Sequence, residues 1–203
     1  PLDTTEATQS LLSATIKPVQ VGLANERVFL VNASLGLYPE LLQDREQYKR
    51  QYGRRRSVAM WSGLRTLMRE HRQLVVEIEH DQGRERVRTP SIFIGNNALQ
   101  LEQVGLEEAE AVKRWRLAAV IVQPVGTTEL IGLAMRGMLG QLGEDDRVRD
   151  FAFQSMTVRP LSGISKRGIK VAVDGEIFWC PPPITFRVAP QPLMLMAPAA
   201  VAQ

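Results

Sequence analysis

Residues 169–183 read IKVAVDGEIFWCPPP, and this stretch predicts a β-hairpin. Within residues 169–173 every second residue is apolar and β-branched, which is the period of a half-buried strand. The apolar run resumes after Asp174-Gly175, a pair that tolerates the positive φ angles of a two-residue hairpin turn. The local pattern therefore explains the carboxylates of Asp174 and Glu176 as turn residues. Whether Glu176 also takes part in chemistry depends on the rest of the chain.

The composition is that of an ordinary globular protein. The chain has 203 residues, of which 44% are hydrophobic and 23% are charged, enough for one sizeable domain or two small ones. No apolar run approaches the roughly 20 residues that cross a bilayer. The opening PLDTTEATQS has no basic region of a signal peptide. It also lacks an initiator Met, so we expect an excerpt from a longer chain.

The small number of cysteines and histidines argues against disulfides, zinc sites and catalytic sites built on Cys or His. The chain holds one cysteine, Cys180, and two histidines, His71 and His80. A single cysteine rules out an internal disulfide and suits a reducing compartment, so we expect a cytoplasmic protein. No cluster has the ligand spacing of a zinc site. No local pattern supports a Ser-His-Asp or Cys-His catalytic site either.

The positive charge is concentrated in one segment. The net formal charge is +3, but residues 45–72 hold nine Arg or Lys against two Glu, so this segment carries +7 and the remainder −4. A concentrated basic segment favours anionic partners: phosphates, an anionic membrane surface or nucleic acid. Nucleic acid is the weakest of the three and is not expected, because no DNA- or RNA-binding signature accompanies the charge.

Helical periodicity is confined to a few segments. We expect helices over residues 3–14, 39–50, 57–71 and 128–139. Asp3 is a candidate N-cap for the first of them. Residues 98–115 are polar and acidic, which predicts a loop.

Strand-like runs fill most of the remaining sequence. Two strands joined by a turn at Ala24-Asn25 precede the basic segment, and after residue 150 only strand-like runs with turn-length connections remain. This order predicts a mainly β (α+β) fold: an antiparallel β-sandwich with two to four helical insertions. No parallel βαβ unit is expected, since such a unit needs a long crossover connection.

Five stretches in a fixed order cover nearly the whole chain. They are VFLVNASLGLYPEL (28–41), KRQYGRRR (49–56), SIFIGNN (91–97), VDGE (173–176) and ITFRVAPQPLMLMAP (184–198). Each alone is common. In this order they resemble the C-terminal domain of the diacylglycerol kinase and sphingosine kinase family of lipid kinases, in its bacterial form.

The resemblance implies half of an enzyme. In that family an N-terminal α/β domain holds nucleotide phosphates with a Gly-Gly-Asp-Gly-Thr motif, and a C-terminal β-sandwich closes the cleft where the lipid hydroxyl meets ATP. The motif does not occur in residues 1–203. We therefore expect a single β-sandwich domain, the lipid-side half of a two-domain kinase whose N-terminal nucleotide-binding domain is absent from this chain. ATP and Mg²⁺ would belong to the full-length enzyme, with none bound by this fragment, which alone should be inactive.

The resemblance also assigns a catalytic role within the predicted hairpin. The Glu of the family's Asp-Gly-Glu triplet is regarded as the proton acceptor for the substrate hydroxyl, and it corresponds to Glu176. A lipid hydroxyl is a poor nucleophile, so phosphoryl transfer requires it to be oriented and relieved of its proton. A carboxylate just after a hairpin turn sits on a rigid element, which suits positioning. Asp174 is expected as a catalytic helper.

Further candidates would bind phosphate, hydroxyl or headgroup. Asn96 and Asn97 could orient phosphate or hydroxyl groups at the mouth of the cleft, and Asn32 and Ser34 could do the same; the alternative is that they cap exposed backbone. The basic run could dock anionic headgroups, each cation contributing about 1 kcal/mol near an anionic surface, or it could be a solvated helix face. Its members are Lys49, Arg50, Arg54, Arg55 and Arg56.

One departure from the family concerns a metal. Some bacterial members carry an Asn-Asp-Gly-Leu stretch whose Asp helps to bind a structural magnesium. Here the corresponding residues are Lys113-Arg114-Trp115-Arg116. A cation would meet positive charge there, so we expect no structural metal, and magnesium would enter only with ATP.

Two functions remain open at this point. The first is the C-terminal domain of an ATP-dependent lipid kinase that phosphorylates the hydroxyl of diacylglycerol or a related lipid. The second is a non-catalytic β-sandwich module that binds lipid or a membrane. Expected partners are the lipid, the nucleotide-binding domain and the periphery of a membrane, at the inner face. Exposed sheet edges would also allow a homodimer.

Overall fold

The computed structural model describes residues 3–12, 14–37, 39, 42, 73–162 and 168–197. The predicted helices 39–50 and 57–71 lie outside the described residues, apart from Pro39 and Leu42, and the whole basic run 49–56 lies outside them too. No helix in the described part of the chain is long and apolar enough to cross a bilayer.

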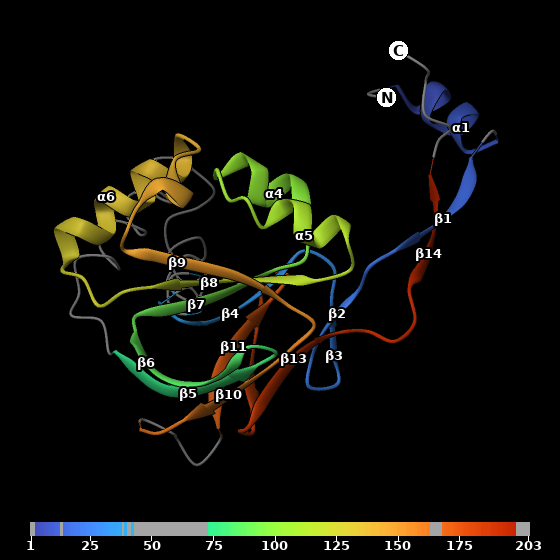
Figure 1. The fold of residues 1–203 in the computed structure, drawn as a ribbon. Coiled ribbons are helices and arrows are strands. Elements are labelled where there is room, and N and C mark those ends of the chain that lie inside the picture. Colours follow the sequence, from blue (N-terminus) through green and yellow to red (C-terminus); the bar gives the residue numbers. More distant parts are fainter. Residues whose placement is uncertain are drawn as a thin grey trace, which may run out of the picture.

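Two six-stranded sheets form the body of the molecule (Figure 1). In spatial order the first sheet contains β3 (Arg27–Phe29), β2 (Gly22–Ala24), β13 (Ile184–Val188), β10 (Ser155–Pro160), β5 (Leu74–His80) and β6 (Gly83–Thr89). The second contains β12 (Glu176–Cys180), β11 (Ile169–Val173), β4 (Asn32–Gly36), β7 (Ser91–Gly95), β8 (Leu117–Val122) and β9 (Val148–Phe153). Every strand pair among the described residues is antiparallel, which confirms the predicted fold class.

The main core lies between the two sheets. Alternate residues of each strand point into it, as the period of two requires: Val76 and Ile78 of β5 face inward, while the intervening Glu77 faces outward. Large fully buried side chains come from both sheets, among them Phe29 and Phe153. The strands are therefore fixed in register, because a slip by one residue would expose this apolar set.

The outer face of the second sheet is covered by three helices and a short 3₁₀ turn. These are α4 (Ala98–Gln103), α5 (Ala109–Lys113), α6 (Thr127–Met138) and η1 (Leu142–Glu144). Leu101, Val112 and Leu133 of the helices pack with Ala118 and Val120 of β8 in a second core. Strand β8 is thus buried on both faces, which explains its unbroken apolar sequence.

The prediction of a loop over residues 98–115 was wrong. Two helices occupy most of it, although they have only six and five residues. The Asn97 side chain begins the first by accepting a hydrogen bond from the Gln100 N–H at 3.2 Å. Burial of Leu101 and Val112 against the sheet then compensates for a polar sequence that helix propensity alone would not hold in place. The predicted helix 128–139 is confirmed as α6, within one residue at each end.

The N-terminal strands are also more finely divided than predicted. The turn lies at Asn25-Glu26 rather than Ala24-Asn25, because Asn25 adopts a φ of 51° and pairs with Thr185 through backbone and side chain. The strands on either side are β2 and β3, and β4 follows after a short connection at residues 30–31.

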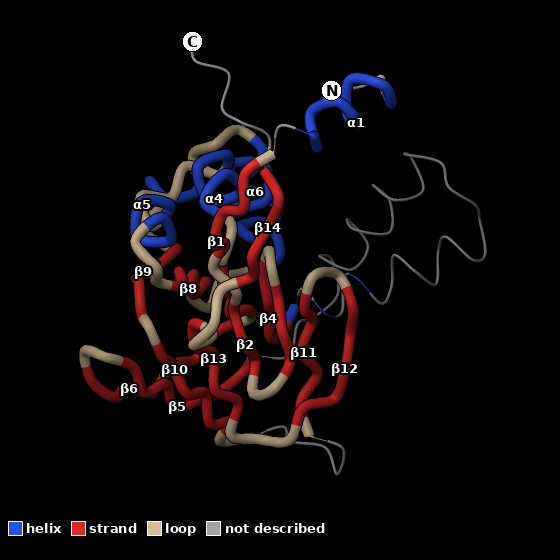
Figure 2. The backbone as a smooth tube through the Cα atoms, turned by 90° about the vertical axis from the view of Figure 1, so that its right-hand side faces the viewer, coloured by secondary structure: helices blue, strands red, loops and turns tan. Residues whose placement is uncertain are grey.

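A two-stranded ribbon and a helix extend beyond the sandwich, to the upper right in Figure 1 and upward in Figure 2. The ribbon pairs β1 (Thr15–Val19) with β14 (Leu193–Ala197), and α1 (Thr4–Leu12) precedes it. Asp3 caps this helix as predicted, accepting a hydrogen bond from the Thr5 N–H at 2.7 Å. Most of the ribbon is exposed on both faces, so it stands apart from the packed core.

Candidate functional site

The Asp-Gly-Glu stretch forms the predicted hairpin. Strands β11 and β12 pair from Ile169↔Cys180 to Val173↔Glu176, which leaves Asp174 and Gly175 as a two-residue turn. Their φ angles are +46° and +88°, as a type I′ turn requires at both central positions. Glu176 is therefore the first residue of β12, at a fixed place beside the turn.

Asp174 ties this turn to the connection between β3 and β4. Its carboxylate accepts hydrogen bonds from the backbone N–H groups of Leu30 at 2.7 Å, Val31 at 2.9 Å and Asn32 at 2.9 Å. Its own N–H donates to the carbonyl oxygen of Asn32 at 2.9 Å. These four bonds give Asp174 a structural task, and its catalytic helper role stays a prediction.

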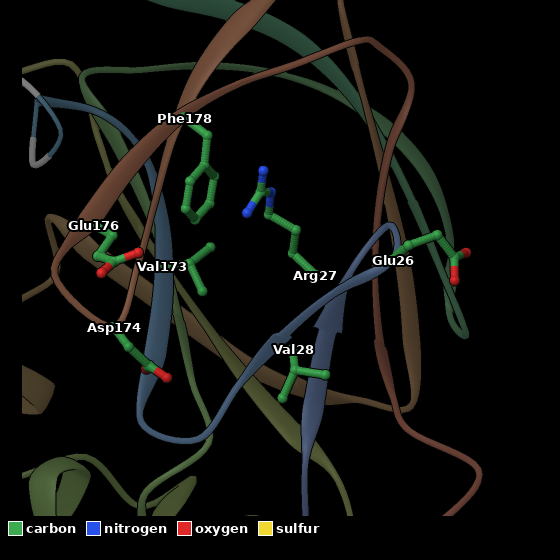
Figure 3. Close-up of a pocket in the computed structure, with 7 residues that line it drawn as sticks. All are labelled: Glu26, Arg27, Val28, Val173, Asp174, Glu176 and Phe178. Carbon is green, nitrogen blue, oxygen red and sulfur yellow. The ribbon is translucent and has the colours of Figure 1, made fainter.

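Glu176 lies at the wall of a pocket of about 460 Å³ (Figure 3). Its side chain is exposed, with no hydrogen bond or ion pair to the residues that the structure describes. The pocket is lined by Glu26, Arg27, Val28, Val173, Asp174, Glu176 and Phe178. A carboxylate in this position is free to accept a hydrogen bond from a ligand.

Arg27 and Phe178 also line the pocket, and no pattern in the sequence indicates that they meet. The Arg27 guanidinium carbon lies 4.1 Å from the centre of the Phe178 ring. The two residues come from different sheets and lie 151 positions apart in the sequence, so no local spacing pairs them. In Figure 3, Glu176 and Arg27 lie on opposite sides of the Phe178 ring.

The structure brings Asn32, Asn96 and Asn97 to the same end of β4 and β7, but their side chains bond to the protein itself. Asn96 is buried and donates to the carbonyl oxygens of Gln20 at 3.1 Å and Leu30 at 2.9 Å. Asn97 caps α4, and the Asn32 amide donates to the Gln100 side chain at 3.1 Å. None of the three lines the pocket, so their proposed contacts with phosphate or hydroxyl stay predictions.

Ser34 lies within β4, away from the pocket. It is fully buried, and its hydroxyl has no hydrogen-bond partner among the described residues. Its neighbours across the sheet are Phe93 and Ala172. The predicted phosphate-binding role of Ser34 has no geometric support from this position.

The segment that departs from the family's metal motif ends α5. The N–H groups of Trp115 and Arg116 donate to the carbonyl oxygens of Val112 at 3.1 Å and Ala111 at 3.2 Å, which closes the helix with Trp115 at a φ of 62°. Lys113 forms ion pairs with Glu102 at 2.8 Å and Glu110 at 2.7 Å. Among the described residues no group of three or more His, Cys, Asp or Glu could hold a metal ion.

Two carboxylates outside the pocket have perturbed acidities. Burial, together with a hydrogen bond to Asp150, raises the pKa of Glu108 to about 7. The hydrogen bonds from Arg147 lower the pKa of Asp145 to about 2, and Arg136 adds a further positive charge at 3.3 Å. Both groups lie in the layer of helices on the second sheet, so neither belongs to the pocket.

Solved structures show what this arrangement is similar to. A proposed diacylglycerol kinase from Bacillus anthracis str. Sterne superposes with a TM-score of 0.62 at 16% identity, covering 93% of this chain and 59% of its own. A second structure of a diacylglycerol kinase from the same organism gives a TM-score of 0.57, again at 16% identity, covering 93% of this chain and 58% of its own. The chain has the fold of these diacylglycerol kinases. No protein-family model matches the sequence.

The alignment spans less than two thirds of each diacylglycerol kinase chain. Both superpositions cover 93% of this chain. At 16% identity the likeness to the diacylglycerol kinases concerns the fold alone. The resemblance drawn from the five sequence stretches is thereby confirmed at the level of the fold.

Proposed function

We propose that the chain is the lipid-side domain of an ATP-dependent lipid kinase that phosphorylates the hydroxyl of diacylglycerol or a related lipid. The observation that carries the proposal is Glu176, an exposed carboxylate held on a type I′ hairpin at the wall of a pocket of about 460 Å³. The hairpin belongs to a fold shared with diacylglycerol kinases. Glu176 accepts the proton of the hydroxyl as it attacks, and Asp174 helps by fixing the turn.

The rigidity of the hairpin suits this role. Three backbone N–H groups hold the Asp174 carboxylate, and the next residue but one is Glu176. A general base works best when its oxygen is held within hydrogen-bond reach of the proton it takes. The turn therefore positions Glu176, while its own side chain stays open to the pocket.

The described residues do not fit the phosphates of a nucleotide. Helices α4 and α6 each follow a strand, as the helix of a phosphate-binding junction does. At both N-termini, however, a side chain of the chain itself already caps the backbone. Asn97 caps α4, and the Glu129 carboxylate accepts a hydrogen bond from the Gly126 N–H at 2.7 Å at the start of α6. We assign ATP and Mg²⁺ to a nucleotide-binding domain of the longer enzyme, with this chain contributing the hydroxyl side of the cleft.

The exposed ribbon supports a partner of that kind. Ile16, Leu193, Met194, Leu195 and Met196 are 41–64% exposed, on a ribbon of only two strands. A two-stranded ribbon is marginal in water by itself, and a contiguous exposed apolar surface marks an interaction site. The nucleotide-binding domain covers this surface in the complete kinase. The enzyme acts in the cytoplasm, at the periphery of the inner membrane face, where its lipid lies.

The decisive experiment replaces Glu176 by Gln in the complete two-domain enzyme. Glu176→Gln keeps the size and hydrogen-bonding shape of the side chain but removes the base. General-base contributions are typically about 100- to 10,000-fold, so kcat falls by about that factor. ATP and lipid binding change little, because the loss falls on the transition state. A kcat within a few-fold of wild type would show that Glu176 is not the base. If the wild-type enzyme binds lipid but does not phosphorylate it, the non-catalytic module is favoured.

A further inference from the structure

The pocket beside Glu176 has a cation, Arg27, without a counter-ion among the described residues. Several arginines of the sandwich pair with carboxylates, such as Arg159 with Glu79 at 2.6 Å and Arg147 with Asp145 at 2.7 Å. Arg27 is exposed, and no ion pair joins it to the part of the chain that the structure describes. Its guanidinium instead stacks on the face of Phe178, 4.1 Å from the ring centre.

The stacking leaves the hydrogen-bond donors of Arg27 available. The five N–H groups of a guanidinium lie in its plane, so a ring against its face does not use them. Phe178 packs against the main core, and Arg27 follows directly on the turn that Asn25 fixes through its bonds to Thr185. The Phe178 ring and the backbone beside Arg27 are therefore anchored, and the stack holds the planar fork at the pocket.

The acidic residues of the pocket leave room for an anion beside Arg27. The carboxylate of Asp174 accepts three backbone N–H bonds. The Glu26 side chain is 92% exposed and lies 3.9 Å from Arg187, outside the stack. The carboxylate of Glu176 lines the same pocket but makes no ion pair with Arg27. The pocket thus offers a fork of donors on one wall and a separate acceptor on the other.

We propose that this pocket binds a phosphate group through Arg27 while a hydroxyl of the same molecule donates to Glu176, so that its ligand is a glycerophosphate-type headgroup. A planar guanidinium matches two phosphate oxygens at once, and a carboxylate accepts a hydroxyl but repels a phosphate. The inference rests on the proposed function and narrows its substrate class. The phosphate is either the diester of a phosphoglycerol lipid head or the monoester of a phosphorylated glycerol.

The test follows the Arg27 side-chain Nε–Hε signal by NMR in the 203-residue chain. The probes are glycerol 3-phosphate, glycerophosphoglycerol, inorganic phosphate and, as the uncharged control, glycerol. Saturable shifts with the phosphate probes and none with glycerol are expected. Binding of the diester identifies the lipid-head source, and binding of the monoester alone identifies the phosphorylated glycerol.

Variants separate this pocket from general attraction to basic surface. For Arg27→Gln, binding of the phosphate probes is followed on the backbone amides of residues 173–178. The affinity falls by about 10- to 100-fold, the usual range for the loss of charge-assisted hydrogen bonds. Arg27→Lys keeps the charge but loses the planar fork, so its binding is intermediate. Arg187→Gln is the matched control on β13, which is separated from β3 by β2 in the same sheet, and it leaves binding unchanged. Glu176→Ala, which removes the hydrogen-bond acceptor, weakens the binding of glycerol 3-phosphate relative to that of inorganic phosphate.

Three results overturn the inference: no saturable shift with any phosphate probe, binding by Arg27→Gln within twofold of wild type, or an equal loss in Arg187→Gln. Each of them is independent of catalysis. If phosphate binding fails while Glu176→Gln still abolishes kinase activity in the complete enzyme, the headgroup assignment is wrong and the proposed function stands. If phosphate binds but Glu176→Gln leaves kcat unchanged, Glu176 is not the base of the proposed function, and the phosphate site stands.

Discussion

Asp174 and Glu176 are two residues apart, but their side chains have opposite surroundings. Asp174 uses both carboxylate oxygens to hold the backbone of residues 30–32. Glu176 makes no bond with the described part of the protein and faces the pocket. One carboxylate therefore serves the fold, and the other is available for chemistry. Substitutions at the two positions should affect different measurements.

Asp174→Asn should lower stability even though Asn tolerates the positive φ of the turn. Its amide nitrogen would face a backbone N–H where the carboxylate oxygen now accepts a bond, and two donors cannot bond to each other. Losing charge-assisted acceptors at this partly solvated turn costs about 1–2 kcal/mol, measured as a shift in the urea midpoint. Glu176→Gln is the control and should leave the midpoint unchanged. An Asp174→Asn chain as stable as wild type would show that these bonds contribute nothing net.

At the scale of elements, the pairing of β2 with β3 depends on Gly22. This glycine lies opposite Phe29 in the register, and a Cβ atom at residue 22 would overlap the fully buried Phe29 ring. Gly22→Ala should therefore destabilise the chain by about 1–3 kcal/mol, the usual cost of overpacking a core. The measurement is equilibrium urea unfolding of the single variants and of the double variant with Phe29→Leu. In the double variant, the smaller side chain at position 29 should recover part of the stability that Gly22→Ala loses. Strict additivity of the two losses would contradict the steric explanation.

Glu108, at the start of α5, lies near Asp150 of β9, and this pair should make the stability of the chain depend on pH. The pKa of Glu108 is raised from its ordinary 4.5 to about 7 by burial and by Asp150. A raised folded-state pKa means that the stabilising contribution is complete below 4.5 and is lost as the pH rises towards 7. Glu108→Gln should therefore raise Tm more at about pH 8 than at about pH 5. An equal effect at both values would show that the pKa of Glu108 is not raised in the folded chain.

The elements that sequence predicted correctly are those with a strong local pattern. The hairpin around Asp174-Gly175 combines strict alternation with a turn pair, and α6 combines helical periodicity with its cap. Helices α4 and α5 were missed because each is about one turn and a half long, and their stability comes from packing on β8. The pocket was only half predicted: Glu176 came from a motif, whereas Arg27 reaches Phe178 through the facing of two sheets, which no local spacing encodes.

At the scale of the whole molecule, the ribbon of β1 and β14 stands out because the rest of the described chain buries so little of it. Its exposed residues alternate between both faces, so folding back onto one surface of the sandwich would cover only half of them. The ribbon begins beside Gln20, whose side-chain amide donates to the side chain of Asn96 at 2.6 Å and to the carbonyl oxygen of Arg116 at 3.0 Å. Its root is therefore fixed to the sandwich, while the ribbon itself extends away from it (Figure 1).

This arrangement predicts that the 203-residue chain has no lipid kinase activity alone and gains it when the nucleotide-binding domain of the same enzyme is supplied as a separate polypeptide. Leu195→Lys places a charge on the exposed ribbon and should abolish this complementation, because burying an unpaired ammonium group in the new interface is costly. The Tm of the isolated chain should hardly change, since substitutions of exposed residues are usually within about 0.5 kcal/mol. Leu139→Lys is the matched control: that leucine is 69% exposed but lies at the end of α6, outside the ribbon. Full complementation by Leu195→Lys would show that the ribbon is not where the two domains meet.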